Sequence, residues 1–364
     1  PLKEIFQKLR ENNSLIAYDF VNLLEFFYSM KNCFKSSKSI NSKIPFNGLK
    51  IAKLINKENN RQISENFTFA RFWIYNYFLK KLFSNSNKIY FYSTFEMLVH
   101  EHVQAFFVHS NFSKSSKVIG YYHTLMSKDF LGHYFYSDEI NSIIFPDLII
   151  TNGNLAKEIL IERGIPKNKI LAGPNLRYSK TTTTKKYYQK NNIVLVPLPL
   201  ADGAILEIMI NVLKLTGSKF KDSNIIFKIK PHPMTKKTKI LNLLGWESYP
   251  KEIIWTDQDI SECLKDSKAA ITFCTGSIID VVLSNTIPIP LMPELDFTWN
   301  NLDILEDRFE VLRPVKEDNI KERINDIFLS KPNKYKRELS EINSILRQGL
   351  NNNSKKYYQK LLSI

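Results

Sequence analysis

Long apolar runs are missing from this chain of 364 residues. A helix that crosses a bilayer needs about 18 to 20 predominantly apolar residues, and no stretch approaches that length. The first four residues, Pro-Leu-Lys-Glu, show no signal-peptide pattern. Cys33, Cys263 and Cys274 have no metal-ligand spacing, and an odd number without a disulfide framework is typical of a reducing compartment. We therefore expect a cytoplasmic protein without a transmembrane segment.

Three common motifs are also absent. The sequence has no Walker A pattern, no Gly-x-Gly-x-x-Gly fingerprint and no Gly-x-Ser-x-Gly nucleophile elbow. These absences argue against a nucleoside triphosphatase, a dehydrogenase and an ordinary serine hydrolase. His100 and His102 lie two residues apart, so on a helix they point to different sides and do not form a zinc site. We predict no metal ion and no bound cofactor.

Positive charge is in excess, with 51 Lys and Arg against 36 Asp and Glu. The charge is spread along the chain, but residues 331–364 alone carry eight Lys or Arg and only two Glu. Two interpretations stay open. One is a solvated Lys-rich surface in a chain of biased composition, and the other is peripheral association with an anionic membrane face. We expect no nucleic-acid partner.

The length suits two domains, and hydrophobic residues at 43% are sufficient to build their cores. Residues 1 to about 85 are expected to be mostly helical. Within them, residues 66–83 are rich in aromatic side chains, and helical spacing places Phe69, Trp73 and Tyr77 on one stripe. A core or interdomain helix is the favoured interpretation, and a membrane- or acceptor-facing surface is the alternative.

Strands and helices alternate from residue 88 onward, which predicts an α/β fold with parallel sheets. In the first half we expect strands over residues 88–92, 118–122, 147–151 and 170–172, and helices over 95–108 and 155–163. The second of these helices should end in a left-handed cap at Gly164. In the second half we expect strands over residues 193–197, 225–230, 253–255, 269–273 and 287–291. Helices are expected over residues 204–216, 260–265, 276–284, 319–329 and 334–348.

A linker separates the two halves. Residues 179–192 contain four consecutive Thr and four Lys, with little apolar periodicity. We therefore predict an N-terminal domain over residues 1–180 and a linker over 181–192. A C-terminal domain follows over residues 193–330, and basic terminal helices over 331–364.

Ligands of open α/β sheets bind outside the carboxyl ends of the strands. The first polar segment at such an end is Lys230-Pro231-His232-Pro233, whose two prolines stiffen the loop and hold His232 at the mouth of the sheet. Histidine and lysine there can donate charge-assisted hydrogen bonds to phosphate oxygens. A proline-rich strand exit with a surface histidine is the other interpretation.

The second polar segment follows the strand predicted over residues 269–273 and opens a helix. Thr275, Gly276 and Ser277 offer hydroxyls and amides that bind anions at a helix N-terminus, and Asp280 lies one turn further on, within reach of a ribose hydroxyl. Thr275 or Ser277 should cap this helix with or without a ligand. Since both segments leave one predicted sheet, we expect them to converge on a phosphate-bearing ligand.

The first half offers acidic, histidine and amide side chains. Glu96 and Glu101 lie on a predicted helix, and His123 follows a predicted strand. Any of the three could act as the base that activates an acceptor hydroxyl. A lone Glu on a helix is more ordinarily a solvated charge. Further polar candidates near strand ends are Asn152, Asn154, Asn175 and Arg177.

The second half resembles bacterial GT-B glycosyltransferases of surface-carbohydrate synthesis, including sialyltransferase-like and Kdo-transferase-like families. Those families carry a His-Pro motif after a strand, and His232-Pro233 matches it. They also carry a Ser/Thr-rich turn followed by an acidic residue, which Thr275, Ser277 and Asp280 match. Asp280 stands where a glutamate is more usual.

The first half is similar to a related family of surface-carbohydrate biosynthesis proteins. That family has a Glu-Asn…Trp-Glu helix, followed by a strand that ends in Gly-Tyr-Gln-His. Glu96 and Glu101 match the two acids, while Met97 and His100 replace the Asn and Trp. Residues 120–123, Gly-Tyr-Tyr-His, match the strand end. The two resemblances together cover roughly residues 88 to 330.

The resemblance implies a GT-B fold of two Rossmann-like domains with parallel sheets that face an interdomain cleft, with terminal helices that return to the first domain. It implies transfer of a CMP-linked nonulosonic acid or Kdo-type sugar to a glycan or glycolipid acceptor, as in lipopolysaccharide or capsule synthesis. In that reaction, Lys230 and His232 would stabilise the leaving phosphate. Two alternatives stay open: another GT-B enzyme, such as a polyol-phosphate transferase or a nucleotide-sugar epimerase, and a non-catalytic glycan- or membrane-binding module.

Overall fold

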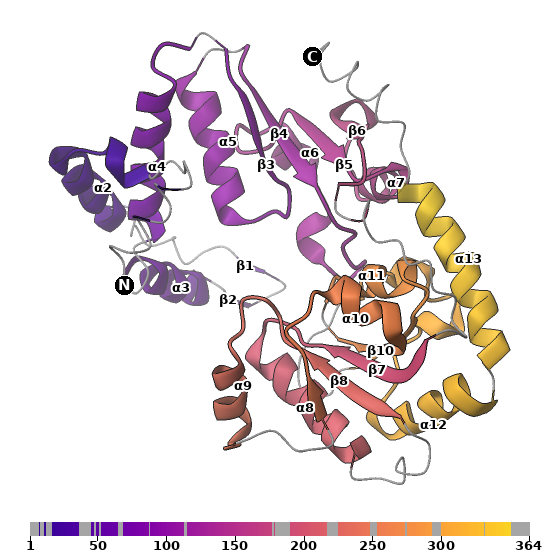
Figure 1. The fold of residues 1–364 in the computed structure, drawn as a ribbon. Coiled ribbons are helices and arrows are strands. Elements are labelled where there is room, and N and C mark those ends of the chain that lie inside the picture. Colours follow the sequence, from indigo (N-terminus) through magenta and orange to yellow (C-terminus); the bar gives the residue numbers. More distant parts are fainter. Residues whose placement is uncertain are drawn as a thin grey trace. The chain divides into compact units, whose positions relative to one another are not determined.

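A computed structural model shows how the chain folds (Figure 1). It describes residues 7, 11, 17–35, 45–46, 49–50, 52–64, 68–86, 88–112, 115–176, 178, 190–216, 225–247, 253–273, 275–292, 300–330 and 332–350. The chain forms two compact units. The first contains Pro1–Gly120 and Asp138–Leu148, and the second contains Tyr121–Ser137 and Ile149–Ile364.

Helices dominate the start of the first unit, as predicted. They are α2 (Leu23–Lys35), α3 (Ala52–Ser64) and α4 (Thr68–Leu82), with a 3-10 turn η1 (Ala17–Phe20) and the short antiparallel pair β1 (Pro45–Phe46) and β2 (Leu49–Lys50). The chain then continues through β3 (Tyr90–Thr94), α5 (Val99–Asn111) and β4 (Lys117–Tyr122).

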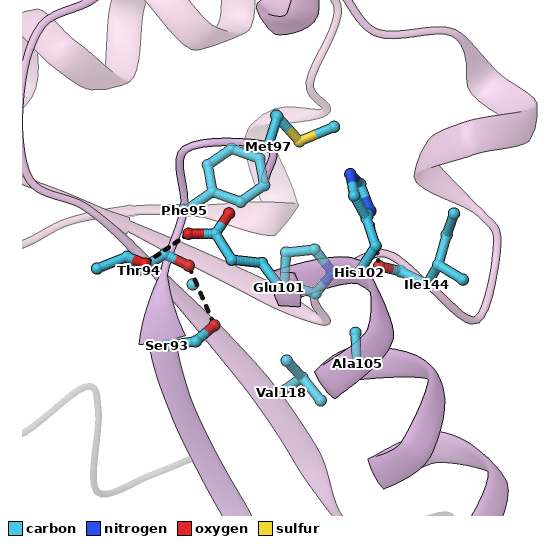
Figure 2. Close-up of a pocket in the computed structure, with 11 residues that line it drawn as sticks. Ser93, Thr94, Phe95, Met97, Glu101, His102, Ala105, Val118 and Ile144 are labelled. Atoms are coloured by element: carbon cyan, nitrogen blue, oxygen red, sulfur yellow. Dashed lines mark hydrogen bonds between the residues drawn. The ribbon is translucent and has the colours of Figure 1, made fainter. Parts of the chain in front are cut away.

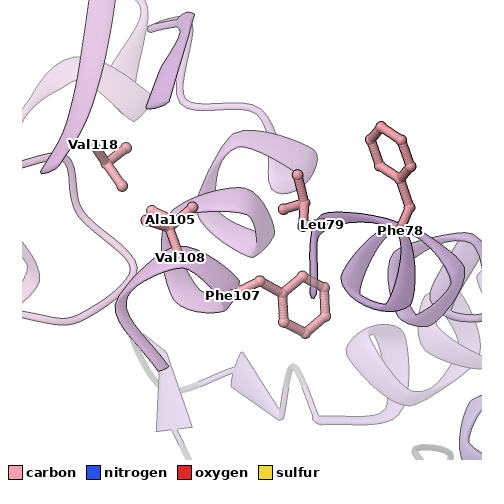
Figure 3. Close-up of a cluster of buried hydrophobic side chains, with 6 residues drawn as sticks. All are labelled: Phe78, Leu79, Ala105, Phe107, Val108 and Val118. Atoms are coloured by element: carbon pink, nitrogen blue, oxygen red, sulfur yellow. The ribbon is translucent and has the colours of Figure 1, made fainter. Parts of the chain in front are cut away.

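The core of the first unit lies where α4 packs against α5. Phe78 and Leu79 of α4 meet side chains of α5 and β4, which are Ala105, Phe107, Val108 and Val118 (Figure 3). The interpretation of α4 as a core helix is confirmed, but the predicted stripe is not its most buried face. Ala70, Ile74 and Phe78 are buried, whereas Trp73 and Tyr77 are half-buried and the Phe69 side chain lies outside the described residues. The reason is that α4 packs against α2 as well as α5.

The helix predicted over residues 95–108 begins later, at Val99. Glu96 therefore lies in the loop between β3 and α5 and not on a helix. Residues 95–98 stay out of the helix because the Glu101 carboxylate accepts two of their backbone N–H groups. Its Oε2 lies 2.9 Å from the Glu96 nitrogen and 3.1 Å from the Leu98 nitrogen. Met97 has a left-handed backbone with φ 60°, which also interrupts a helical path.

One sheet has four strands in the order β3-β4-β5-β6, with β5 (Leu148–Thr151) parallel to β6 (Ile170–Ala172). The short helix α6 (Ser137–Ile140) precedes β5, and α7 (Asn154–Glu162) connects β5 to β6. Gly164 has φ 103° just beyond α7, so the predicted left-handed cap is confirmed.

The second unit contains a five-stranded sheet in the order β11-β10-β7-β8-β9. Its strands are β7 (Asn191–Pro197), β8 (Ile226–Lys230), β9 (Ile253–Trp255), β10 (Ser267–Thr272) and β11 (Ile287–Pro290). They alternate with α8 (Asp202–Thr216), α9 (Lys237–Leu244), α10 (Ile260–Asp266) and α11 (Ser277–Leu283). Leu195, Ala270, Leu264 and Val281 form a core between the sheet and α10 and α11. Continuous apolar strands of this kind are expected where both faces of a parallel sheet are covered.

The predicted linker was placed up to residue 192, but it ends earlier in the structure. β7 begins at Asn191, and Lys190 is buried immediately before it. The Lys190 ammonium donates to the carbonyls of Leu264 and Ser284, at 2.6 and 2.7 Å, and to Thr286 Oγ1 at 2.8 Å. The rest of the predicted linker, apart from this end, lies outside the described residues.

The chain ends in α12 (Ile320–Asn325), a π-helical turn (Asp326–Ser330) and α13 (Pro332–Leu350). α13 packs against α11 and against α7, which both belong to the second compact unit, so the expected return of the terminal helices to the first domain stays a prediction. Among the described helices, none has the length and apolar character that a membrane crossing requires.

Candidate functional site

The C-terminal sheet reverses its strand order next to β7. β7 is its first strand along the chain, with β8 and β9 on one side and β10 and β11 on the other. The neighbouring strands all pair in parallel, so they all end at the same edge. Ligands of open α/β sheets bind at such a reversal, outside the carboxyl ends of the strands. The loops after β7, β8 and β10 therefore form the candidate site.

Backbone hydrogen bonds hold the loop after β8. The Leu198 N–H donates to the Lys230 carbonyl at 2.8 Å, which joins the ends of β7 and β8, and the Thr235 N–H donates to the His232 carbonyl at 2.8 Å. The Met234 N–H donates to His232 Nδ1 at 3.2 Å. Because Nδ1 accepts this bond, a neutral His232 carries its proton on Nε2. Nε2–H is then the group that can donate to a ligand.

The surroundings of His232 favour its neutral form. Burial lowers the pKa of His232, and the positive charge of Lys230 lowers it further. Lys230 Nζ donates to the Pro231 carbonyl at 3.2 Å, so the ammonium stays within this loop. A neutral histidine donor beside a lysine is well suited to phosphate oxygens.

The loop after β10 brings two hydroxyls together. Thr275 Oγ1 and Ser277 Oγ lie 2.6 Å apart, and Thr275 Oγ1 also accepts the Ser277 N–H at 3.2 Å. The N-cap of α11 is Gly276, so neither Thr275 nor Ser277 is the N-cap residue that the sequence predicted. Asp280 lies half-buried in the first turn of α11.

Thr272 and the loop after β7 are parts of this edge that the sequence did not single out. Thr272 is the last residue of β10, and its buried hydroxyl oxygen has no hydrogen-bond partner in the described part of the chain. The loop after β7 contains Leu198, Pro199 and the exposed Leu200. The Pro-Leu-Pro-Leu sequence at the end of this apolar strand could have indicated the loop.

β8 and β10 both neighbour β7, so at normal strand spacing their ends lie about 10 Å apart. The predicted nucleotide-binding residues thus share one edge of one sheet: Lys230, His232, Pro233, Thr275, Gly276, Ser277 and Asp280. This arrangement can hold an extended anionic ligand across the end of β7, with donors on both sides.

Glu101 stabilises the loop that carries Glu96. Besides the N–H groups of Glu96 and Leu98, its buried carboxylate accepts a hydrogen bond from Thr94 Oγ1 at 2.5 Å. Both carboxylate oxygens are therefore used to shape the loop, and Figure 2 shows the carboxylate directed toward Thr94. Glu96 is half-buried, at the carboxyl end of β3.

The cavity beside Glu101 is small. It is lined by Phe95, Met97, His102 and Ile144, among others, and its volume is about 10 Å³ (Figure 2). That is roughly the space of one water molecule, so this cavity does not accommodate a sugar.

His123 lies at the end of β4, where Asn152 fixes the backbone. Asn152 Nδ2 donates to the His123 carbonyl at 2.9 Å, and the Asn152 N–H donates to the Tyr122 carbonyl at 3.2 Å. Asn152 is fully buried, so it joins the ends of β4 and β5 and does not offer its donor to a ligand.

The remaining predicted residues have other positions. Asn154 is the exposed first residue of α7. Asn175 Oδ1 accepts the Tyr178 N–H at 2.9 Å and forms a local turn. Arg177 lies outside the described residues. Of the two that the structure describes, neither is placed beside the other predicted site residues.

No protein-family model and no curated protein matches the chain. Among solved structures, UDP-GlcNAc 2-epimerase from Neisseria meningitidis bound to UDP-GlcNAc is similar, with a TM-score of 0.51 and 13% identity over 92% of this chain and 89% of that chain. UDP-N-acetylglucosamine 2-epimerase from Rickettsia bellii has a TM-score of 0.51 and 14% identity over 82% of this chain and 80% of that one.

At these identities the likeness shows the fold alone. The chain has a GT-B fold with two parallel sheets, which confirms the fold class expected from the sequence. Neither of these two structures is a sialyltransferase or a Kdo transferase, and the finer resemblance stays a prediction.

Proposed function

We propose that this chain is an enzyme that acts on a nucleotide-linked sugar, with the nucleotide bound at the carboxyl ends of β7, β8 and β10. One observation carries the proposal. His232 follows β8 and the Thr275 and Ser277 hydroxyls follow β10, so the two groups lie on either side of the end of β7, where the strand order reverses. Phosphate oxygens need several converging donors, and this edge supplies an imidazole N–H, an ammonium group and two hydroxyls.

Each residue has a distinct proposed role. His232 donates through Nε2–H to the phosphate on the leaving side, and Lys230 supplies the positive charge that stabilises this phosphate as the sugar–oxygen bond breaks. Thr275 and Ser277 bind further phosphate oxygens, and Asp280 accepts from a ribose hydroxyl. Glu96 is the proposed catalytic carboxylate. Glu101 is a positioning residue, because both of its oxygens hold the loop that carries Glu96.

We propose a UDP-linked sugar as the first donor to test. The similar Neisseria meningitidis structure contains UDP-GlcNAc, and two strand ends about 10 Å apart suit an extended nucleoside diphosphate sugar. A CMP-linked sugar, which only the sequence resemblance implies, is the second donor to test.

Sugar transfer to a glycan or glycolipid acceptor and epimerisation of the nucleotide sugar are the two candidate reactions. Transfer rests on the His-Pro segment and the Ser/Thr turn. Epimerisation is supported by one specific observation, namely that the two similar solved structures described above, from Neisseria meningitidis and Rickettsia bellii, are UDP-GlcNAc 2-epimerases. A transferase releases UDP only when an acceptor is present, whereas an epimerase converts the sugar without one.

Nucleotide binding is the decisive test. We expect UDP to raise the melting temperature of the purified chain more than CMP, GDP or CDP does. His232→Ala should raise the dissociation constant for UDP by about 10- to 100-fold, since one hydrogen bond to a charged group is lost. His100→Ala, at an exposed histidine of α5, is the matched control. Stabilisation by none of the four nucleotides, or full binding by the His232 variant, would contradict the proposed site.

Turnover separates the two reactions and tests Glu96. UDP-GlcNAc is followed by NMR, with and without a mixture of glycan acceptors. We expect Glu96→Gln to lower turnover and leave UDP affinity within about twofold of wild type, because the substitution removes a charge and leaves the phosphate donors in place. Unchanged turnover in the Glu96 variant would remove Glu96 from the mechanism.

A further inference from the structure

The helix α2 has its large apolar side chains on the outside. Leu23, Leu24, Phe27, Tyr28 and Phe34, here called the α2 apolar face, have between 54% and 77% of their surface exposed. At 100° per residue these positions span roughly 140° of the helix, so they form one continuous stripe. Scattered apolar residues on a surface need no explanation, but a contiguous stripe of this kind marks an interaction surface.

Small side chains lie on the opposite side of α2. Ser29 and Cys33 are both fully buried, four residues apart, and Cys33 packs with Ala70 of α4. Glu25 forms an ion pair with Lys81 of α4, with Nζ and Oε2 at 2.6 Å. These contacts fix the rotation of the helix. The α2 apolar face therefore cannot turn inward without breaking them.

Charge identifies the kind of partner. The only acidic residue of α2 is Glu25, which is on the inner side, whereas Lys31 is exposed within the α2 apolar face. The first unit, residues 1–120 and 138–148, contains 17 Lys and Arg against 11 Asp and Glu. A second copy of this chain would bring two positive surfaces together, whereas an anionic surface would be attracted.

We propose that the α2 apolar face inserts into the interfacial layer of an anionic lipid membrane. Leucine and phenylalanine would enter the region between headgroups and acyl chains, Tyr28 would keep its hydroxyl among the headgroups, and Lys31 would reach anionic phosphates. This places the membrane contact on α2. The sequence had suggested the aromatic residues of α4 or the basic residues 331–364, and α4 is a core helix.

Vesicle co-sedimentation of the full chain tests the proposal. Wild type should bind vesicles of phosphatidylglycerol and phosphatidylcholine, less strongly at high salt and less strongly to phosphatidylcholine alone. The double variant Leu24→Gln, Phe27→Gln should bind about tenfold more weakly or worse, since two apolar side chains no longer leave water. Lys31→Glu should weaken binding to the anionic vesicles much more than to the neutral ones.

The matched control is a second double variant, Tyr136→Gln, Leu329→Gln, whose side chains are 79% and 66% exposed in the other compact unit. It should bind vesicles as wild type does. Circular dichroism should show every variant folded, because the replaced side chains face solvent. Absence of vesicle binding by wild type, or equal binding by the α2 double variant, overturns the proposal. If instead wild type self-associates and the α2 double variant does not, the α2 apolar face binds a second copy of this chain, and the membrane proposal is overturned. None of these results depends on nucleotide binding, which the UDP melting shift measures separately.

Discussion

His109 has hydrogen-bond acceptors on both sides of its ring. Its Nδ1 lies 2.7 Å from the Ile143 carbonyl and its Nε2 lies 3.0 Å from Asp147 Oδ2. Both nitrogens must donate to satisfy these partners, which only the protonated imidazole does. The hydrogen bond with Asp147 raises the pKa of His109, against the opposing effect of burial. Burial raises the pKa of Asp147, but its bonds with His109 and the Val118 N–H outweigh this and the pKa is lowered.

The pair should make stability depend on pH. A histidine with a raised folded pKa contributes most below its unfolded pKa of about 6.5 and loses the contribution as pH rises through the folded value. Asp147 contributes above its unfolded pKa of about 3.9 and loses the contribution as pH falls below that. We expect His109→Gln to cost about 1 kcal/mol near pH 5.5 and less near pH 8.5. Urea unfolding at the two pH values measures this, and an equal cost at both would show that the imidazolium is not the stabilising form.

The loop at Glu96 shows what one sequence reveals about single residues. Glu96 and Glu101 were both candidates, because both are acidic, lie on one expected helix and match the two acids of the similar family. Their roles separate only in three dimensions, where Glu101 accepts from the backbone of residues 96 and 98. Lys190 is similar: the sequence predicted a linker lysine, yet it is buried and hydrogen-bonded to three distant residues. Contacts over such separations leave no local pattern in the sequence.

At the scale of elements, Gly153 allows α7 and α13 to approach. It has φ 112°, and a Cβ at this position would lie 2.3 Å from the Gly349 carbonyl oxygen of α13. Gly153→Ala should therefore cost about 3 kcal/mol or more, since strain in the backbone adds to a clash with another backbone. Gly245 is the matched control, because it has φ 66° and a Cβ there would meet nothing within 4 Å. Gly245→Ala should cost about 1 kcal/mol. Thermal unfolding compares the two variants, and similar costs would show that the α7–α13 contact is not tight.

The strands were the most predictable elements. Continuous apolar runs such as Ile-Val-Leu-Val in β7 locate the C-terminal sheet because both of its faces are covered. The order β11-β10-β7-β8-β9 could not be obtained from these runs, since each strand alone fits any position in the sheet. Helix starts were less predictable. α5 begins after a capping interaction that depends on Glu101, and the apolar spacing before it looked helical.

At the scale of the whole molecule, the GT-B fold class expected from the sequence is confirmed. The domain boundary expected over residues 181–192 lies mostly outside the described residues and stays a prediction. The compact units separate elsewhere, and Tyr121–Ser137 belongs with the C-terminal half. Composition could not reveal this, because the contacts that hold this segment join residues far apart in the sequence, such as Ser127 and Asp303.

Asp303 makes the central contacts of that segment. One of its carboxylate oxygens, Oδ2, accepts from the Ser127 hydroxyl and, at 2.7 Å, from the Lys128 N–H. Lys128 Nζ adds an ion pair with Glu306 at 2.6 Å, and Asn301 donates to the Leu125 carbonyl. Ser127, Asn301 and Asp303 are all buried, so water cannot replace these bonds. Asp303 thus joins the loop that follows β4, which begins at His123, to the C-terminal half of the chain.

Replacing Asp303 should separate loss of its hydrogen bonds from loss of its charge. Asp303→Ala leaves a buried hydroxyl and a backbone N–H without their acceptor, so we expect the free energy of unfolding to fall by about 2 to 3 kcal/mol.

Asp303→Asn keeps an acceptor at that position and removes the charge. Burial raises the pKa of Asp303, so the carboxylate destabilises the fold increasingly as pH rises from about 3.9 through the folded value. The Asn variant should therefore match or exceed wild-type stability at pH 7, and its advantage should shrink toward pH 4. Urea unfolding at both pH values measures the two effects. An Ala variant within about 0.5 kcal/mol of wild type would mean that Asp303 does not hold the Tyr121–Ser137 segment in place.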